Sequence, residues 1–181
     1  VITVEAIDSD NKTLSETDTT LTTSGTLSVK DLDKTDVITT SFTVASTQKD
    51  ASNNVMSRDS NEPSNSILAS MLTITQTPID GTTQSGIISW AFNSGSEAFN
   101  YLASGETLTL TYTIKATDDD SSQAYDTQTV VITIVGTNDV PTVLVDNIDR
   151  MTSFGKEFSK ETAYLFADLD KTDIFKFEAS N

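Results

Sequence analysis

The clearest alternation of apolar and polar residues lies between Gly105 and Pro141. Every second residue from Leu108 to Ala116 is apolar, and the residues between them are threonines and Lys115. A period of two is the pattern of a strand with one buried face and one face in water. Thr127–Val135 repeats the alternation on the way back. The pattern predicts a β-hairpin that is closed by an acidic loop at residues 118–120.

Shorter alternating segments, separated by turn residues, occur along the rest of the chain. They lie at residues 1–7, 25–30, 37–45, 68–76 and 87–92. Seven or eight short strands with no convincing helical period are typical of an all-β Greek-key sandwich. Residues 46–66 are rich in Ser, Asn and Asp and are predicted to form a long surface loop. The single tryptophan, Trp90, is predicted to be a core residue between the sheets rather than part of a sugar-binding surface.

A six-residue segment occurs twice in the chain. Asp31–Asp36 reads Asp-Leu-Asp-Lys-Thr-Asp and recurs letter for letter as Asp168–Asp173, 137 residues later. An internal repeat of this kind indicates tandem units. We therefore expect one complete domain at residues 1–141 and the first strands of a second, incomplete domain at residues 142–181. About forty residues of sandwich cannot bury a core alone, so this tail is expected to pack on the first domain or on another molecule.

Composition narrows the classes of function. The chain has 27 acidic and 11 basic side chains and a formal net charge of −16. Such a surface repels nucleic acid and anionic lipid and attracts cations, and no apolar run is long enough to insert into a membrane. The chain lacks cysteine and histidine, which excludes disulfides, zinc–thiolate sites and an imidazole base. Because Val1 is not an initiator methionine, we expect the chain to be a piece of a longer protein.

Acidic residues are concentrated in the turns at the strand ends. Calcium binds six to eight oxygens from carboxylates and carbonyls, and crowded carboxylates repel one another unless a cation screens them. Solvated turns with Asx geometry are the plainer interpretation. The recurrence of the clusters, one of them beside a predicted domain boundary, favours Ca²⁺, although the glycine and glutamate of an EF-hand loop are absent. The candidate ligands are Asp31, Asp33, Asp36, Asp118, Asp119, Asp120, Asn138, Asp139, Asp168, Asp170 and Asp173.

Four segments of the chain resemble the VCBS-type repeats of large bacterial RTX-like surface adhesins. They are Gly25–Val29 with Asp31–Asp33, Ser89–Phe92, Leu102–Thr109 and Gly136–Pro141. The likeness covers most of residues 1–141, and the loop at residues 46–66 departs from the family pattern. Residues 154–177 look like the opening of a second, cadherin-like repeat of the dystroglycan type, or of another copy of the same family.

The resemblance implies an Ig-like or cadherin-like sandwich in a tandem array, within a type I-secreted adhesin on the bacterial cell surface. It implies a structural extender whose junctions are stiffened by calcium, in a protein that holds cells to a host, a surface or a biofilm. Its partners are then the neighbouring repeats of the same chain and a host or biofilm surface ligand.

The sequence leaves two other classes of function beside the structural extender. The first is a ligand-binding module that reads a sugar or a peptide through the 46–66 loop or the acidic loop ends. The second is an enzyme, which is not expected, because the carboxylates lie in turns without an evident aromatic cleft and the Ser and Thr hydroxyls lack a base.

Overall fold

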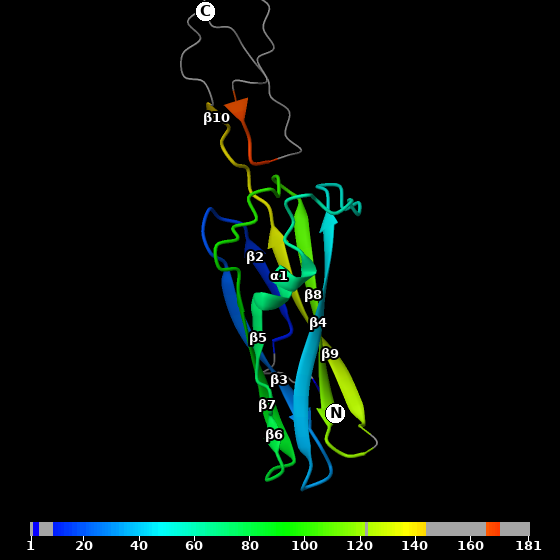
Figure 1. The fold of residues 1–181 in the computed structure, drawn as a ribbon. Coiled ribbons are helices and arrows are strands. Elements are labelled where there is room, and N and C mark those ends of the chain that lie inside the picture. Colours follow the sequence, from blue (N-terminus) through cyan, green and yellow to red (C-terminus); the bar gives the residue numbers. More distant parts are fainter. Residues whose placement is uncertain (1, 4–8, 122, 144–165, 171–181) are drawn as a thin grey trace, which may run out of the picture.

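Two sheets face each other in an elongated sandwich (Figure 1). The computed structural model describes residues 2–3, 9–121, 123–143 and 166–170. The first sheet has the order β1 (Ile2–Thr3), β3 (Thr22–Lys30), β7 (Ser85–Asn93) and β5 (Leu72–Ile74). The second has the order β2 (Asn11–Ser15), β9 (Tyr125–Val135), β8 (Thr107–Asp118), β4 (Val37–Lys49) and β6 (Ile79–Asp80).

This architecture confirms the all-β Greek-key sandwich. All strand pairs within the two sheets are antiparallel except β2 with β9, and the strand order is that of an Ig-like fold. The described residues form nine strands in the sandwich, more than the seven or eight that were predicted. The two strands that were not predicted are β2 and β6: β2 is a short polar strand with one apolar residue, and β6 has two residues, so neither shows an alternation.

The predicted hairpin is the centre of the second sheet. β8 pairs with β9 from Thr107↔Val135 to Thr117↔Tyr125, and its other edge pairs with β4. Alternate residues from Leu108 to Ala116 on β8 and from Val130 to Ile134 on β9 are buried and belong to one core with the inward side chains of β3 and β7. Each large apolar side chain removed from water contributes about 1.5–3 kcal/mol, so this hairpin supplies much of the stability of the sandwich.

Two local predictions were wrong. Leu68 was expected on a strand, but it lies on a short helix, α1 (Asn65–Ser70), which precedes β5. Its carbonyl accepts a hydrogen bond of 2.8 Å from the buried Tyr112 hydroxyl, and the spacing of Leu68, Met71 and Leu72 also fits one face of a helix. In addition, β4 continues to Lys49, so the loop spans residues 50–64 rather than 46–66. The helix in the described part of the chain lacks the length and the apolar run that crossing a bilayer requires.

Trp90 fills the core, as predicted. The ring is buried, and its Nε1 donates a hydrogen bond of 3.0 Å to the carbonyl of Ser9. Gly25 lies opposite Trp90 on β3, where a Cβ atom would come within 2.6 Å of the indole Cζ2. A glycine at position 25 therefore leaves the space that the indole occupies.

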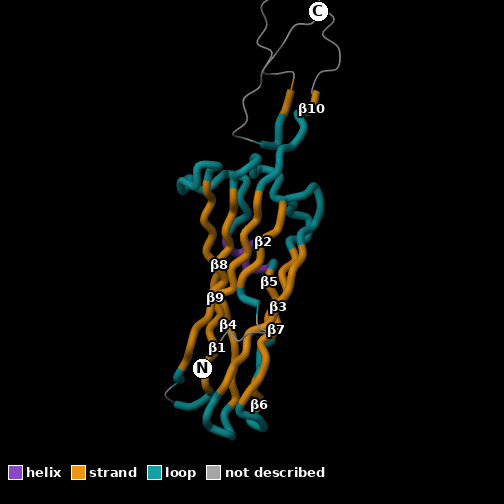
Figure 2. Tube along the Cα trace, turned by 180° about the vertical axis from the view of Figure 1, so that it is seen from behind, coloured by secondary structure: helices purple, strands orange, loops and turns teal. Residues whose placement is uncertain are grey.

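The chain enters and leaves the sandwich at opposite ends (Figures 1 and 2). β1 pairs with the last residues of β3, next to the end formed by the β3–β4 turn and the β8–β9 loop, which we call the tip. β9 leads out at the other end, which we call the junction end. Beyond it, β10 (Thr142–Val143) and β11 (Phe166–Ala167) pair in a separate two-stranded sheet.

Among the residues that the structure describes, the buried core cluster runs from Leu21 to Ile134 and includes none from the tail. We therefore expect the sandwich to fold without the tail. The domain boundary at residue 141 stays a prediction, because residues 144–165 and 171–181 lie outside the described part of the chain.

Replacing Trp90 with alanine should lower the free energy of unfolding by about 3–5 kcal/mol, because it removes a large side chain from a closed core. Ile87→Ala, on the same strand but at an exposed position, is the matched control and should change it by less than about 1 kcal/mol. Urea unfolding followed by circular dichroism measures both. Equal effects of the two variants would contradict the placement of Trp90 in the core.

Candidate metal centres

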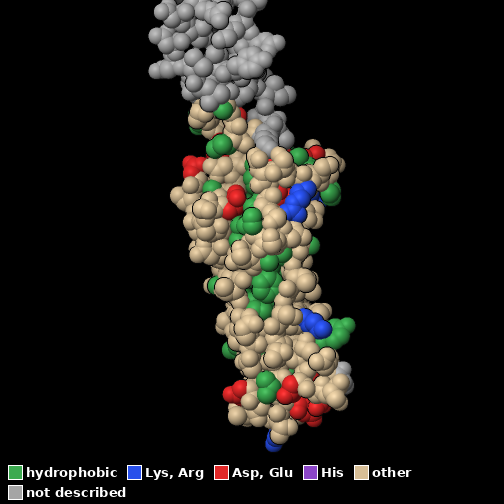
Figure 3. Space-filling view, viewed as in Figure 1, with side chains coloured by type: hydrophobic (Ala, Val, Ile, Leu, Met, Phe, Trp, Pro, Cys, Tyr) green, Lys and Arg blue, Asp and Glu red, His purple; other side chains and the backbone are tan. Residues whose placement is uncertain are grey.

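Two groups of three carboxylates lie at opposite ends of the sandwich. The tip cluster is Asp31, Asp36 and Asp118, and the junction cluster is Glu16, Asp18 and Asp139. Within each cluster, one oxygen from every residue lies within 4.8 Å of the others. Figure 3 shows Asp and Glu side chains gathered at the lower end of the molecule, where the tip cluster lies.

The tip cluster is formed where three strand ends meet. Asp31 follows β3, Asp36 precedes β4 and Asp118 ends β8. Asp36 is only 8% exposed, and its Oδ2 has no hydrogen-bond partner among the residues that the structure describes. Burial raises the pKa of Asp36, and the charges of Asp118, Asp120, Asp33 and Asp31 raise it further. These groups therefore disfavour the ionised form of Asp36 unless a cation is present.

Asp33, Asp119 and Asp120 were also predicted as ligands, but the structure does not bring them into the tip cluster. The backbone N–H groups of Asp33 and Asp120 donate to Asp31 and Asp118, at 3.0 and 3.1 Å, so both segments form Asx turns. Asp119 accepts a hydrogen bond of 3.0 Å from the N–H of Val37 and ties the hairpin loop to β4. Asp33 and Asp120 thus contribute charge, and Asp119 contributes a structural hydrogen bond.

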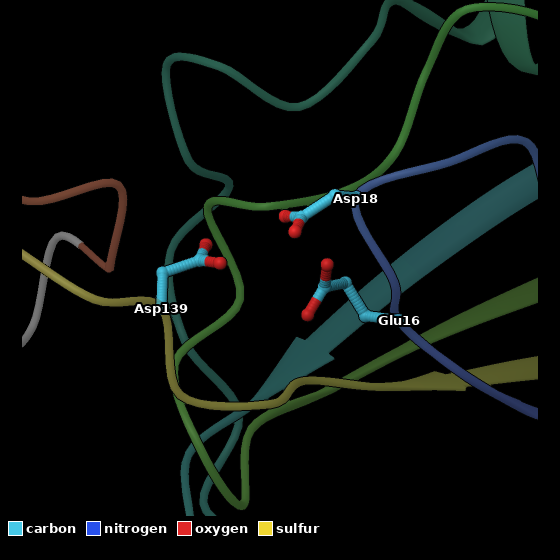
Figure 4. A group of neighbouring side chains, drawn as sticks. All are labelled: Glu16, Asp18 and Asp139. Carbon is cyan, nitrogen blue, oxygen red and sulfur yellow. The ribbon is translucent and has the colours of Figure 1, made fainter.

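The junction cluster depends on the parallel pairing of β2 with β9. That register places Ser15 opposite Val135, so the residues that follow each strand lie side by side. Glu16 is 2% exposed, and its Oε2 accepts hydrogen bonds from the N–H and the hydroxyl of Thr137, at 3.3 and 2.5 Å. Its Oε1 has no hydrogen-bond partner in the described residues. Figure 4 shows that Glu16, Asp18 and Asp139 point toward one another.

Asp139 is the residue at which the outgoing chain meets the junction cluster. Burial raises its pKa to about 6, with further contributions from the charges of Glu16, Asp170, Asp18 and Asp168. Its Oδ2 has no hydrogen-bond partner within the described ranges. Its N–H donates a hydrogen bond of 2.7 Å to Asp170, which is 1% exposed. The linker is thereby held to the first turn of the following segment.

Sequence reasoning missed Glu16 and Asp18. They follow a short polar strand, and only the β2–β9 pairing reveals that they meet Asp139. The predicted ligand Asn138 is exposed and lies outside the three-carboxylate group; its Nδ2 donates a hydrogen bond of 2.8 Å to the carbonyl of Asp139. The predicted ligand Asp173 lies outside the described residues.

The two copies of the repeated hexapeptide begin with the same backbone turn. Asp168 accepts a hydrogen bond of 3.1 Å from the N–H of Asp170, as Asp31 accepts one of 3.0 Å from Asp33. Asp168 and Asp170 lie beside the junction cluster, and both raise the pKa of Asp139. The junction end therefore gathers acidic groups from the sandwich and from the start of the following segment.

Both clusters offer only oxygen ligands, which are the ligands of hard cations such as Ca²⁺ and Mg²⁺. No ion pair with Lys or Arg involves Glu16, Asp36 or Asp139 in the part of the chain that the structure describes. Each of these three carboxylates has one buried oxygen without a hydrogen-bond partner in the described residues, and such an oxygen on an ionised group without a counter-charge is destabilising. A divalent cation would relieve this at both clusters, and the larger, flexible coordination sphere of Ca²⁺ suits turn carboxylates best.

The loop at residues 50–64, where a ligand-binding surface was considered, is closed by its own contacts. The Asp50 carboxylate accepts hydrogen bonds from the N–H groups of Ser52 and Asn54, at 2.9 and 2.8 Å. The buried Glu62 accepts a hydrogen bond from Ser46 and forms an ion pair of 3.4 Å with Arg58. These hydrogen bonds and this ion pair hold the loop in its own fold.

Comparisons with known proteins add little to this picture. No protein-family model matches the chain, and no curated protein matches it. The periplasmic chaperone SfaE is similar with a TM-score of 0.36 and 9% identity, over 71% of this chain and 55% of the chaperone. The ASH/PapD-like domain 7 of human CEP192 is similar with a TM-score of 0.39 and 12% identity, over 74% of this chain and 89% of that domain. Likeness at this level carries no argument about function.

The raised pKa of Asp139 predicts a pH dependence in calcium-free buffer. Because the pKa of Asp139 is higher in the folded state, protonation of this carboxyl stabilises the fold at low pH. This contribution is lost as the pH rises from about 4 through about 6, where the carboxyl ionises. Asp139→Asn removes the titration, so the stability of the variant relative to the wild type should be higher at pH 7 than at pH 4. Urea unfolding midpoints at the two pH values measure it. The same relative stability at both pH values would contradict the raised pKa, and Asp59→Asn in the 50–64 loop is the matched control.

Proposed function

We propose that this chain is a structural extender of a bacterial cell-surface adhesin, in which calcium stiffens the junction between consecutive repeats. The proposal rests on the environment of Glu16. Its side chain is 2% exposed and lies beside two further carboxylates, and its Oε1 atom has no hydrogen-bond partner among the described residues. This arrangement lies where the chain leaves the sandwich, and a cation there would fix the direction of the linker.

The proposed ion joins elements that are distant in the sequence. Glu16 and Asp18 belong to the sandwich, whereas Asp139 belongs to the linker. The linker is also held to Asp170 through its backbone N–H. Calcium bound at the junction cluster would therefore reduce the bending of the next segment relative to the sandwich.

The free energy of calcium binding is large enough to stiffen the junction. Extracellular calcium sites have dissociation constants of about 10⁻⁴–10⁻³ M. Calcium at ten to one hundred times the dissociation constant stabilises the bound state by roughly 1.4–2.7 kcal/mol per site. Such an energy shifts a bending ensemble about tenfold to one hundredfold toward one geometry.

The tip cluster has the same role at the other end. It lies at the end where the chain enters, and it contains Asp31 and Asp36 of the hexapeptide that recurs after the linker. A preceding repeat would meet the tip as the tail meets the junction end. Repeats joined in this way form a stiff extended rod that is not enzymatic and works outside the cell, where calcium is abundant.

Calcium should raise the midpoint of thermal unfolding of the wild-type chain, and Glu16→Gln should reduce this calcium-dependent increase by half or more. The reason is that glutamine keeps the hydrogen-bonding shape of Glu16 but loses the charge that attracts the ion. The matched control is Asp59→Asn, which removes one negative charge outside both clusters. Differential scanning calorimetry in millimolar calcium and in chelator measures all three chains.

Small-angle scattering of the wild-type chain provides a readout of stiffness. The radius of gyration and the maximum dimension should be better defined with calcium than with chelator. Identical melting curves and identical scattering curves in the two buffers would rule out the calcium-stiffened extender.

A further inference from the structure

A hollow lies at the junction end, beside the candidate metal centre but outside it. It has a volume of about 340 Å³ and is lined by Asn61, Glu97, Ala98, Asn100, Tyr101 and Leu169. The hydroxyl of Tyr101 and the Oδ1 of Asn100 are buried without hydrogen-bond partners in the described residues. Buried polar atoms normally have partners, so this surface is incomplete as it stands.

Leu169 is the residue of the tail that lines the hollow. It is the second residue of the repeated Asp-Leu-Asp-Lys-Thr-Asp segment, and the matching residue in the first copy is Leu32. Both leucines lie within Asx turns of the same kind, with N–H to Oδ1 distances of 3.1 and 3.0 Å. Leu32 is 89% exposed at the tip, whereas Leu169, against the sandwich, is 54% exposed.

We propose that Leu32 is a docking residue, and that it lies in the hollow at the junction end of a preceding unit of the same kind as this one. The proposal rests on the tandem arrangement proposed above, and it adds an apolar contact to the junction that is independent of any cation. The occupant of the hollow is thus the Asp31–Asp36 segment of the next repeat, and Leu169, which lines the hollow in this chain, marks the place where Leu32 would dock.

The docking segment carries one basic side chain among its three aspartates, and the lining of the hollow contains one carboxylate, that of Glu97. The docking segment brings the Lys34 ammonium two residues after Leu32. The lysine of the hexapeptide is therefore suited to lie against the acidic side of the hollow.

A single leucine is too small a contact for two separate chains to associate stably. Association pays a large entropic cost, which one side chain does not offset. Within one polypeptide the linker holds the two surfaces at high effective concentration, so a weak contact is populated. We therefore place this docking between consecutive units of one chain and not between free molecules.

Disulfide trapping in a fused chain tests the proposal, because the natural sequence has no cysteine. The fused chain joins residues 1–143 of one copy directly to residues 7–181 of a second copy. The Leu32 residue of the second copy then follows the first copy at the same chain distance as Leu169 does in the natural sequence. The upstream copy is expected to fold without its own tail, since the core residues in the described part of the chain lie between Leu21 and Ile134. Ala98→Cys or Asn61→Cys in the upstream copy is combined with Leu32→Cys in the downstream copy.

Under mild oxidation, the hollow pairs should form the intramolecular disulfide at least tenfold faster than a matched control pair. The control places the upstream cysteine at Val55, which is exposed in the 50–64 loop and does not line the hollow. Circular dichroism confirms that each reduced chain is folded. Rates at both hollow positions that are equal to the rate at Val55 would overturn the docking of Leu32.

Running the same reactions in calcium and in chelator separates this inference from the proposed function. A preference for the hollow in both buffers, without any effect of calcium on melting or scattering, would leave the docking intact and remove the calcium role. Calcium-dependent stiffening without a preference for the hollow would do the reverse.

Discussion

The arrangement of both ends depends on one electrostatic constraint, the crowding of carboxylates at buried strand ends. Strand pairing, and not the charges themselves, brings these groups together: the β2–β9 register fixes Glu16 beside the linker, and the ends of β3, β4 and β8 fix the tip cluster. The core that enforces this pairing also keeps water from Glu16 and Asp36. The fold therefore holds negative side chains where they repel one another, and a divalent cation is the group that best relieves the repulsion.

The two acidic clusters lie at opposite ends of the elongated sandwich (Figure 1). The chain enters the sandwich beside the tip cluster and leaves it beside the junction cluster. The hexapeptide occurs once at the tip and once after the linker. The backbone hydrogen bond to Asp170 holds the linker without a cation, and the proposed ion and the proposed docking residue would act on the same joint.

Much of the fold could be predicted from the sequence, because alternation reports burial directly. Leu108 to Ala116 read as a half-buried strand and became the central strand of a sheet. Leu68 was misassigned because a short apolar run fits a strand and a helix equally well, and its packing beneath Tyr112 decided between them. Some candidate ligands could also be predicted from the sequence and others could not. Asp31, Asp36, Asp118 and Asp139 could be found from local acidity, whereas Glu16 and Asp18 could not, because they meet Asp139 only through a parallel pairing of strands 110 or more residues apart in the chain.

The most direct test of the central claim is a crystal structure of the full chain grown with calcium, with anomalous differences measured to identify the ion. The account predicts a calcium peak bound by Glu16, Asp18 and Asp139, with carboxylate oxygens at about 2.3–2.6 Å. Ordered carboxylates at the junction cluster without an anomalous peak, at millimolar calcium, would contradict it.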